Sequence, residues 1–514
     1  MAEAARFENP DALIIAKLHP ETVRGTKRGY LPAVAKRLGF TIFTEPVSPW
    51  SLLDLRPHVY TVSSQFGFEA LMDGCKVTCF GVPFYAGWGL TDDRSAIPDR
   101  RRRVRNSREL GAAVYLRYAK YFDCWRRTPV SAEVAADQLS FLQRSYLANN
   151  KPVIGYRIAR WKRPSISAML WGPHGRPRFT SSLAKAIDLA QKSNASVAAW
   201  GAEAIRLRPV FAARGISCIA IEDGFLRSVG LGAAFVQPLS LVFDHTGLYY
   251  DSRSPSDLEN MLSRSEDLQD DSKRAEALRD RIVRERITKY NLRSLHPLPD
   301  LSANTGQQVV VVPGQVADDW AVRLGRPAAF PADRNVNALL LHEARAAHPA
   351  SFIVFKPHPD VERLGRAGRL TGRELNLADA VVHDVPLDDL LIRADRVEAY
   401  SSLAGFEALL RGVPVTVYGQ PFYAGWGLTE DRNPPARRGH QRTLNELVAA
   451  ALIRYPRYWD PVSRLPCTPE MALERLGQPA VARPVVSYLQ AKLGQMVIWS
   501  KGLTRKLKDP VDEC

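Results

Sequence analysis

Short apolar runs alternate with stretches of helical spacing between residues 150 and 465, and this alternation predicts an α/β fold. The runs that predict strands are Ser196–Trp200, Cys218–Ile221, Val309–Val312, Phe352–Phe355 and Val415–Tyr418. The stretches that predict helices are Leu183–Lys192, Glu203–Ala213, Val336–Ala347 and Leu403–Arg411. Strands that repeatedly precede helices favour parallel sheets with right-handed crossovers. Their number predicts two Rossmann-like domains of about 150 residues each that face one cleft.

One sequence pattern occurs twice in the chain. Residues 63–94 read SSQFGFEALMDGCKVTCFGVPFYAGWGLTDDR, and residues 401–432 read SSLAGFEALLRGVPVTVYGQPFYAGWGLTEDR. Upstream, AKLHP at 16–20 matches FKPHP at 355–359. Downstream, Glu109, Tyr118, Tyr121 and Asp123 match Glu446, Tyr455, Tyr458 and Asp460. Matches of this length indicate a duplicated domain.

The two copies differ in what precedes them. The second copy follows the strand pattern VVVVPGQ at 309–315 and a longer α/β region that begins near Lys151, whereas the first begins almost directly at DALIIAKLHP. A truncated gene, a start assigned too late and a fragment kept as an accessory piece all fit this difference. The predicted organisation is a partial copy in 1–145, a first Rossmann-like domain in 146–305, a second in 306–465 and C-terminal helices in 466–514.

The composition favours anionic partners. The formal net charge is +16, which suits nucleotide phosphates, acidic sugars or anionic lipid, although a genomic bias toward arginine would give the same excess. No nucleic-acid-binding motif accompanies the charge, so nucleic acid is not an expected partner. The chain has no apolar run of about 18 residues, no signal-peptide pattern and six cysteines without a CxxC pair. We therefore expect a cytoplasmic protein without a zinc site or disulfides.

Polar residues of the second domain stand at the end of a predicted strand and at the start of a predicted helix. Ligands of open α/β sheets bind beyond the carboxyl ends of the strands. Lys356 and His358 come after the run 352–355, with Pro359 stiffening the loop, and are placed to meet a phosphate. A plain turn with solvated charges is the alternative. Ser401 and Ser402 open a helix, where hydroxyls and backbone N–H groups bind an anion or simply cap the helix.

Three further features of this domain are weaker signals. Glu407 lies farther along the same helix and suits a ribose hydroxyl or a capping interaction. Gln315 stands at the loop after the run 309–312. The aromatic loop 420–427, QPFYAGWG, either walls a nucleoside or sugar pocket or packs the seam between domains.

The first Rossmann-like domain carries an acidic motif. Glu222 and Asp223 follow the run 218–221, and Arg227 comes one turn later. Glycosyl transfer needs one carboxylate to attack or stabilise an oxocarbenium-like centre and an acid–base group beside it, although a capping Asp beside a surface Glu is the plainer interpretation. Residues 244–247 and 249–251 are placed to complete an acceptor side.

These motifs resemble the KpsC/LipA capsule polysaccharide family of β-Kdo transferases. The strings that carry the resemblance are EDGFLRSVGLG, residues 244–251, FKPHPDV, SSLAGFEAL and PFYAGWGLT. The resemblance covers 151–465, and 1–145 through the repeat. It implies tandem GT-B-like modules, each with two Rossmann-like domains that face a cleft.

The resemblance also implies the chemistry. Each module is expected to use CMP-Kdo, with retention and without a metal or cofactor, to build a poly-Kdo linker on a phosphatidylglycerol-type lipid. The implied setting is the cytoplasmic face of the inner membrane, with a lipid-linked Kdo acceptor and the capsule assembly and export machinery as partners. Asp223 is the expected nucleophile, with Glu222 and Arg227 as further catalytic residues. The residues expected to bind the nucleotide are Gln315, Lys356, His358, Pro359, Ser401, Ser402 and Glu407.

The first copy departs from the family pattern, because it lacks the half that would carry its own acidic motif. Only one of the two linkages is therefore expected here. Another GT-B transferase or epimerase with a different sugar nucleotide, or a non-catalytic remnant that scaffolds capsule machinery, are the alternative functions.

The C-terminal tail combines apolar residues at near-helical spacing with basic residues. Its apolar residues include Leu489, Leu493, Val497, Ile498, Trp499, Leu503 and Leu507, and its basic residues include Lys492, Lys501, Arg505, Lys506 and Lys508. An apolar stripe bordered by cations suits an interfacial helix on anionic lipid, and a helix that crosses back to the first domain is the alternative.

Overall fold

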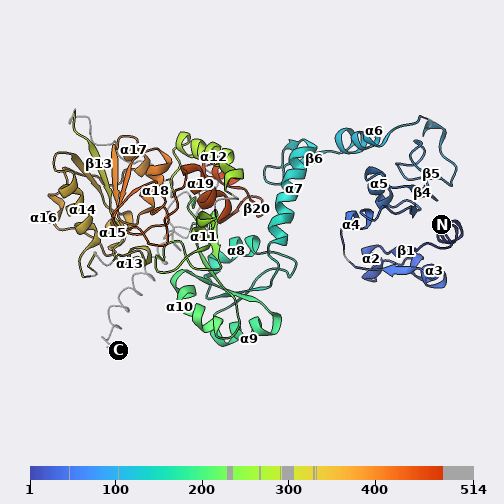
Figure 1. Cartoon of the computed structure of the whole chain (residues 1–514), viewed down its shortest axis with the longest axis horizontal. Coiled ribbons are helices and arrows are strands. Elements are labelled where there is room, and N and C mark those ends of the chain that lie inside the picture. Colours follow the sequence, from blue (N-terminus) through green and yellow to red (C-terminus); the bar gives the residue numbers. More distant parts are fainter. Residues whose placement is uncertain are drawn as a thin grey trace. The chain divides into compact units, whose positions relative to one another are not determined.

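The chain forms two compact units. The computed structural model describes residues 1–478 apart from 46, 102, 229–235, 265–267, 290, 292–305, 328, 329 and 332. Unit 1 contains Met1–Asp123 and Arg127–Asp137, and unit 2 contains Cys124–Arg126 and the residues from 138 onward. Helix α7 (Ala132–Leu147, Figure 1) contributes to both, so the predicted boundary at residue 145 falls inside a helix.

The second Rossmann half of unit 2 is built on a six-stranded parallel sheet with the order β15-β14-β13-β16-β17-β18. The strands are β13 (Val309–Pro313), β14 (Phe352–Lys356), β15 (Ala380–Val381), β16 (Arg396–Ala399), β17 (Val415–Val417) and β18 (Glu430–Asp431). Counted along the chain this is the order 3-2-1-4-5-6 of dinucleotide-binding folds, and it reverses between β13 and β16. The crevice beyond the carboxyl ends of these two strands is therefore the expected ligand site.

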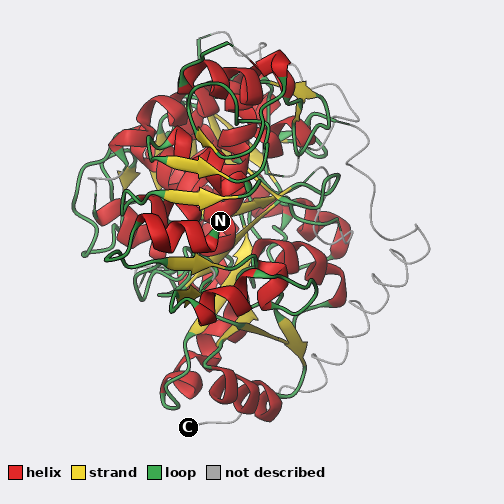
Figure 2. Cartoon of the chain, turned by 90° about the vertical axis from the view of Figure 1, so that its right-hand side faces the viewer, coloured by secondary structure: helices red, strands yellow, loops and turns green. Residues whose placement is uncertain are grey.

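Helices cover both faces of this sheet. Figure 2 draws the helices of the chain in red and its strands in yellow. The helices of this half are α13 (Trp320–Leu324), α14 (Val336–Ala347), α15 (Pro359–Leu364), α16 (Gly372–Leu375), α17 (Leu387–Leu391) and α18 (Leu403–Leu410). Successive residues of β13 point to opposite faces. Val310 and Val312 pack with Leu340 of α14, whereas Val311 packs in the cluster that contains Phe406 of α18. Burial on both faces explains why β13 reads as a continuous apolar run.

The first Rossmann half has a seven-stranded mixed sheet with the order β20-β19-β12-β11-β10-β8-β9. The strands are β8 (Val153–Tyr156), β9 (Arg178–Thr180), β10 (Ser196–Trp200), β11 (Cys218–Asp223), β12 (Ser240–Asp244), β19 (Pro456–Trp459) and β20 (Pro466–Cys467). The four strands from β8 to β11 are parallel, and β12, β19 and β20 continue the sheet antiparallel. The helices are α8 (Arg163–Met169), α9 (Leu183–Ser193), α10 (Gly201–Ala212), α11 (Asp257–Ser263), α12 (Ser272–Arg284) and α20 (Pro469–Leu476).

Two predicted boundaries differ from the structure. Residues 456–467 were placed in or beside the second domain, but β19 and β20 extend the first sheet, because α19 (Leu444–Val448) and a π-helical segment (Ala449–Arg454) carry the chain back. Strand β11 also runs two residues beyond the predicted Ile221. Glu222 and Asp223 therefore belong to the strand itself and have the rigid placement of paired backbone.

Unit 1 repeats the second Rossmann half in reduced form. Its strands are β1 (Ile15–Lys17), β2 (Thr41–Phe43), β3 (Val59–Thr61), β4 (Val77–Cys79), β5 (Asp92–Asp93), β6 (Tyr121–Phe122) and β7 (Pro129–Val130). Its helices are α1 (Ala2–Glu8), α2 (Pro20–Val23), α3 (Leu31–Arg37), α4 (Pro49–Leu53), α5 (Gln65–Met72) and α6 (Ser107–Gly111). Strands β1 and β2 form one sheet, and β3, β4 and β5 form another. The described part of unit 1 has no counterpart of the central strand β13, which would join these two sheets.

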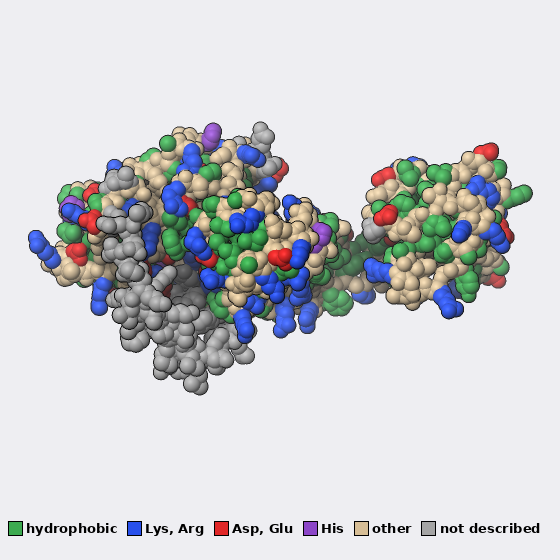
Figure 3. Space-filling view, turned by 90° about the horizontal axis from the view of Figure 1, so that it is seen from below, with side chains coloured by type: hydrophobic (Ala, Val, Ile, Leu, Met, Phe, Trp, Pro, Cys, Tyr) green, Lys and Arg blue, Asp and Glu red, His purple; other side chains and the backbone are tan. Residues whose placement is uncertain are grey.

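The charge excess lies at least partly on the surface. On the face drawn in Figure 3, Lys and Arg side chains outnumber Asp and Glu. Within the described residues, no helix has both the length and the apolar character needed to cross a bilayer. The predicted interfacial helix of the C-terminal tail lies outside the described residues.

Candidate active site

A cavity of about 1210 Å³ opens between the two Rossmann halves of unit 2. Of the residues predicted to catalyse transfer or to bind the nucleotide, all except Arg227 line it. Glu222 and Asp223 belong to the wall that the first half contributes. The second half contributes the opposite wall, which contains Gln315, Lys356, His358, Pro359, Ser401, Ser402 and Glu407.

One part of the second wall lies at the topological switch point of the sheet. Gln315 follows β13 and Ser401 follows β16, and the two are joined by paired hydrogen bonds. The Gln315 amide donates to Ser401 Oγ (3.0 Å), and the Ser401 backbone N–H donates to Gln315 Oε1 (2.9 Å). Ser402 is the N-cap of α18, and its hydroxyl accepts from the Ala404 N–H (3.2 Å). Capping thus accounts for Ser402, while the Gln315–Ser401 pair fixes the loops that border the cavity.

His358 and Lys356 lie at the carboxyl end of β14, in the same wall of the cavity. His358 caps α15, because its Nδ1 accepts from the Asp360 N–H (3.1 Å). With Nδ1 as the acceptor, the neutral ring carries its proton on Nε2. Burial lowers the pKa of His358, so the ring is a neutral donor at pH 7. Lys356 supplies a charge on the same loop.

Glu407 has a partner that the sequence did not indicate. Its Oε1 accepts from the backbone N–H of Lys289 (2.7 Å), and burial raises the pKa of the Glu407 carboxyl. Lys289 belongs to the chain that follows α12, and it also lines the cavity. Glu407 thus ties the second half to this connection, and its contact with a ribose hydroxyl stays a prediction.

Asp223 is held through one carboxylate oxygen only. Oδ2 accepts from Arg227 Nε (2.7 Å), whereas Oδ1 is buried and has no hydrogen-bond partner. Burial raises the pKa of Asp223, but Arg227, with Lys162 and Lys289, more than offsets this, so the pKa lies below its ordinary value. Asp223 is therefore ionised, and because Oδ1 is buried, it borders the cavity through the rest of its side chain, which is 20% exposed.

Glu222 differs from Asp223, because both of its carboxyl oxygens accept hydrogen bonds. Its Oε1 accepts from the Asp223 N–H (2.9 Å), and its Oε2 accepts from the Tyr250 hydroxyl (3.3 Å). Burial and the neighbouring Asp223 raise the pKa of Glu222 to about 7. Two adjacent carboxyls whose pKa values are driven apart suit a nucleophile and an acid–base group.

Arg227 lies behind the nucleophile candidate and not in the cavity. Its side chain is 1% exposed, and Nη1 donates to Ser228 Oγ (2.8 Å) while Nε holds Asp223. Its position is that of an orienting residue, because burial separates it from a ligand. Asp244, predicted near the acceptor, is likewise buried and accepts from the Tyr455 hydroxyl (2.7 Å), whereas Tyr250 lines the cavity.

The aromatic loop 420–427 both borders the cavity and packs against the first half. Phe422 lines the cavity and packs on Phe225 of the first half, with 4.4 Å between ring centroids. Trp426 and Tyr423 are buried, and the Tyr423 hydroxyl donates to the Ser402 carbonyl (2.5 Å). One end of the loop therefore borders the cavity while the other forms core.

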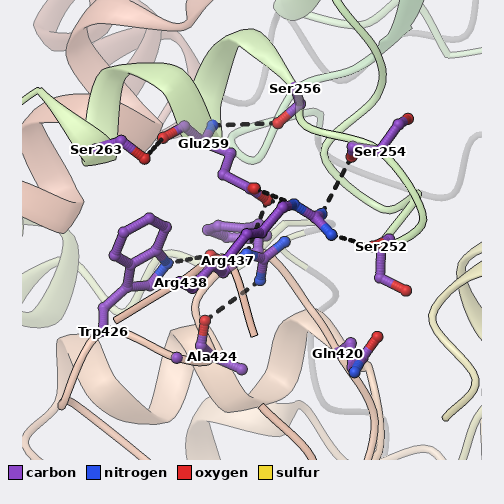
Figure 4. Close-up of polar contacts among 12 residues, drawn as sticks. Ser252, Ser254, Ser256, Glu259, Ser263, Gln420, Ala424, Trp426, Arg437 and Arg438 are labelled. Carbon is purple, nitrogen blue, oxygen red and sulfur yellow. Dashed lines mark hydrogen bonds and ion pairs between the residues drawn. The ribbon is translucent and has the colours of Figure 1, made fainter. Parts of the chain in front are cut away.

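A buried ion cluster fastens the two halves beside this loop (Figure 4). Glu259 of α11 receives both Arg437 and Arg438, which follow β18 of the second half. Arg438 Nε lies 2.8 Å from Glu259 Oε2, and Arg437 also donates to the Ser252 carbonyl (2.6 Å). The sequence did not single out these residues, since 178 positions separate Glu259 from Arg437.

Unit 1 reproduces the local geometry of the second half. The Tyr85 hydroxyl donates to the Ser64 carbonyl (2.5 Å), as Tyr423 does to Ser402. Arg101 Nη1 donates to the Pro83 carbonyl (2.6 Å), as Arg438 does to that of Pro421. The duplication therefore extends to individual hydrogen bonds.

The described part of unit 1 contains no opposing half. Phe84 is 45% exposed where its counterpart Phe422 is 5% exposed, and Tyr118 is 87% exposed where Tyr455 is 5% exposed. In unit 2, the counterparts Phe422 and Tyr455 pack against residues of the first Rossmann half. Among the described residues of unit 1, nothing corresponds to the strand that carries Glu222 and Asp223.

Residues 1–121 and 195–458 match the family model of capsule polysaccharide biosynthesis proteins. The chain belongs to this family. It is 36% identical over 488 residues to the capsule polysaccharide modification protein LipA of Neisseria meningitidis serogroup B, an alignment that covers 93% of this chain and 67% of LipA.

Two solved structures of Thermosulfurimonas dismutans KpsC are similar to this capsule family member. The β-Kdo 2,7 transferase shares 33% identity and a TM-score of 0.52, covering 64% of this chain and 99% of that chain. The β-Kdo 2,4 transferase shares 32% identity and a TM-score of 0.53, covering 64% and 98%. The predicted membership of the KpsC/LipA family and the GT-B-like fold are confirmed.

Proposed function

We propose that unit 2 is a glycosyltransferase that transfers Kdo from CMP-Kdo to a lipid-linked Kdo acceptor and so extends the poly-Kdo linker of a capsule polysaccharide. One observation carries the proposal: the carboxyl pair Glu222–Asp223 faces Lys356 and His358 across a single cavity. The relatives support the choice of sugar, since both solved KpsC structures are β-Kdo transferases.

The proposed reaction has two displacements at C2 of Kdo, which together retain its configuration. The Asp223 carboxylate attacks C2, the bond from C2 to the phosphate oxygen breaks, and CMP leaves with the bonding electrons. The acceptor hydroxyl then attacks C2, the bond from C2 to Asp223 breaks, and Glu222 takes the hydroxyl proton. Arg227 holds Asp223 Oδ2 and so fixes the orientation of the carboxylate.

The nucleotide is proposed to bind the second wall. His358 Nε2–H and Lys356 would donate to the phosphate, and Ser401 with Gln315 would border the nucleoside. Donors that are neutral or fixed before binding lose little solvation when the anion arrives. In this proposal the second wall binds the phosphate, and the first wall supplies the groups that exchange bonds.

Transfer is expected to depend on the ionisation of Glu222. A base acts in its carboxylate form, which predominates above its pKa of about 7. The rate under saturating substrates should therefore fall about tenfold for each pH unit below that value. A pH profile of kcat between about pH 5 and 9 measures this limb. In Glu222→Gln the rate should be low and the limb absent, and a limb that persists in that variant would exclude Glu222 as the base.

The donor is tested by incubating the full chain with a Kdo-primed lipid acceptor and either CMP-Kdo or UDP-sugars. Transfer from CMP-Kdo alone is the expected result. Transfer only from a UDP-sugar would instead support another GT-B enzyme, and no transfer or donor hydrolysis with any of them would support a scaffolding remnant.

The proposed setting is the cytoplasmic face of the inner membrane, where a phosphatidylglycerol-type acceptor and the capsule export machinery would meet the enzyme. The names of the relatives, which concern capsule polysaccharide, support this setting. Contact of the C-terminal tail with the membrane surface stays a prediction.

A further inference from the structure

Lys289 lines the cavity although it does not follow a strand. It follows α12 in the chain, yet it lines the cavity with residues of both halves. Its backbone N–H donates to Glu407 Oε1 of the second half (2.7 Å). Its backbone carbonyl accepts from the Ser228 N–H of the first half (3.3 Å). Both Rossmann halves therefore fix the same residue.

The anchor on the first half continues to the carboxyl pair. Ser228 Oγ accepts from Arg227 Nη1 (2.8 Å), and Arg227 Nε holds Asp223 Oδ2 (2.7 Å). Asn291 adds a hydrogen bond from its side-chain amide to the Ser228 carbonyl (3.1 Å). A continuous path of hydrogen bonds thus relates the position of Lys289 to that of Asp223.

The charge of Lys289 acts on both walls of the cavity. It stabilises the carboxylate forms of Glu222 and Asp223, and it disfavours protonation of His358. Lys356 also acts on His358, and Lys162 also acts on the two carboxyls. The charge of Lys289 therefore acts on His358 of the second wall and on the carboxyl pair of the first wall.

We propose that Lys289 is an anion-binding residue that holds the nucleotide phosphate at the point where the bond to the sugar breaks. The inference rests on the proposed function, since that function supplies the phosphate. When the bond from C2 to the phosphate oxygen breaks, the phosphate gains a negative charge. The ammonium group of Lys289, placed at this phosphate, would stabilise the added charge more than it stabilises the diester.

The position also explains why the connection between the halves is tied down on both sides. A lysine side chain is flexible, and its charge contributes to a chosen site only if its backbone is fixed. Glu407 and Ser228 provide this fixation. The role of Glu407 is thereby extended from a predicted nucleoside contact to the support of a phosphate ligand.

The test compares CMP with cytidine by isothermal titration calorimetry of the full chain, because the two ligands differ only in the phosphate. In Lys289→Met, the affinity for CMP should fall about tenfold to a hundredfold, and the affinity for cytidine should stay within about twofold. Lys289→Arg should recover part of the loss. Lys273→Met, an exposed lysine of α12, is the matched control and should change neither affinity.

Equal losses for CMP and cytidine in Lys289→Met would show a structural role of the connection and overturn the proposal, as would no loss for either. Failure of the proposed function has a different signature. A scaffolding remnant would bind neither nucleotide, and this result would overturn both proposals. With a UDP-sugar as the donor, the unaltered protein would prefer UMP to CMP, and the phosphate test would be made with UMP against uridine. The ratio of nucleotide to nucleoside affinity then still decides the role of Lys289.

Discussion

Replacing Asp223 by asparagine in the full chain is expected to lower sugar transfer by about 10³-fold or more. The variant keeps the shape of the side chain but removes the ionised Oδ1 that has no hydrogen-bond partner in the structure. The affinity for CMP should change by less than about threefold, because the phosphate donors belong to the opposite wall. Transfer of labelled Kdo and calorimetric titration of CMP measure the two quantities.

The surface variant Asp280→Asn on α12 is the control, and it should leave both quantities unchanged. Mass spectrometry of the unaltered chain with CMP-Kdo, but without acceptor, should find Kdo on the peptide that contains Asp223. Transfer at the original rate by Asp223→Asn, or an adduct on another residue, would show that the nucleophile lies elsewhere.

The same variant tests unit 1, because it leaves the first copy of the repeat intact. Unit 1 keeps His19, Ser63, Ser64 and Glu69, the counterparts of the nucleotide-side residues. It has no opposing carboxyl pair among its described residues, and the aromatic side chains that such a half would cover are exposed. We therefore expect no residual transfer that belongs to unit 1.

The sequence predicted the parts of the site that depend on local order. Strand ends are visible as breaks in apolar runs, and ligands bind at strand ends, so Lys356 and His358 could be found without a structure. Ser401 could be found as a serine at the start of a predicted helix. The repeat strengthened the choice of Lys356 and His358, because Lys17 and His19 stand at the same place in the first copy. In the structure both histidines also cap a helix, and His19 accepts from the Glu21 N–H (3.2 Å).

The sequence did not predict the parts that depend on packing between distant segments. Lys289 follows a helix, and it enters the cavity only because Glu407 and Ser228 hold its backbone from two different domains. Arg227 was expected in the cavity because it follows the acidic motif closely. The turn after β11 instead buries it behind Asp223, a direction that sequence spacing does not encode.

Glu259→Gln is expected to destabilise unit 2 by about 3–5 kcal/mol. Glu259 is 5% exposed and accepts from Arg437 and Arg438 at the seam between the halves. Removal of its charge leaves the Arg438 guanidinium, whose side chain is 2% exposed, buried without a counter-ion, whereas Arg437 is partly exposed. Burying an unpaired charge costs more than the pair contributes when intact. The free energy of unfolding is measured by urea denaturation followed through tryptophan fluorescence.

The chain itself supplies two controls for this measurement. Glu276→Gln removes an exposed carboxylate from α12 of the same half and should change the stability of unit 2 by less than about 0.5 kcal/mol. Unit 1 is the second control, because Arg101 donates to the Pro83 and Ala86 carbonyls as Arg438 does to those of Pro421 and Ala424, while the described part of unit 1 supplies no counterpart of Glu259. The unfolding transition of unit 1 should therefore stay in place while that of unit 2 moves to lower urea. A Glu259→Gln variant as stable as Glu276→Gln would mean that hydrogen bonds to backbone carbonyls suffice for both arginines, and that the seam does not depend on the ion cluster.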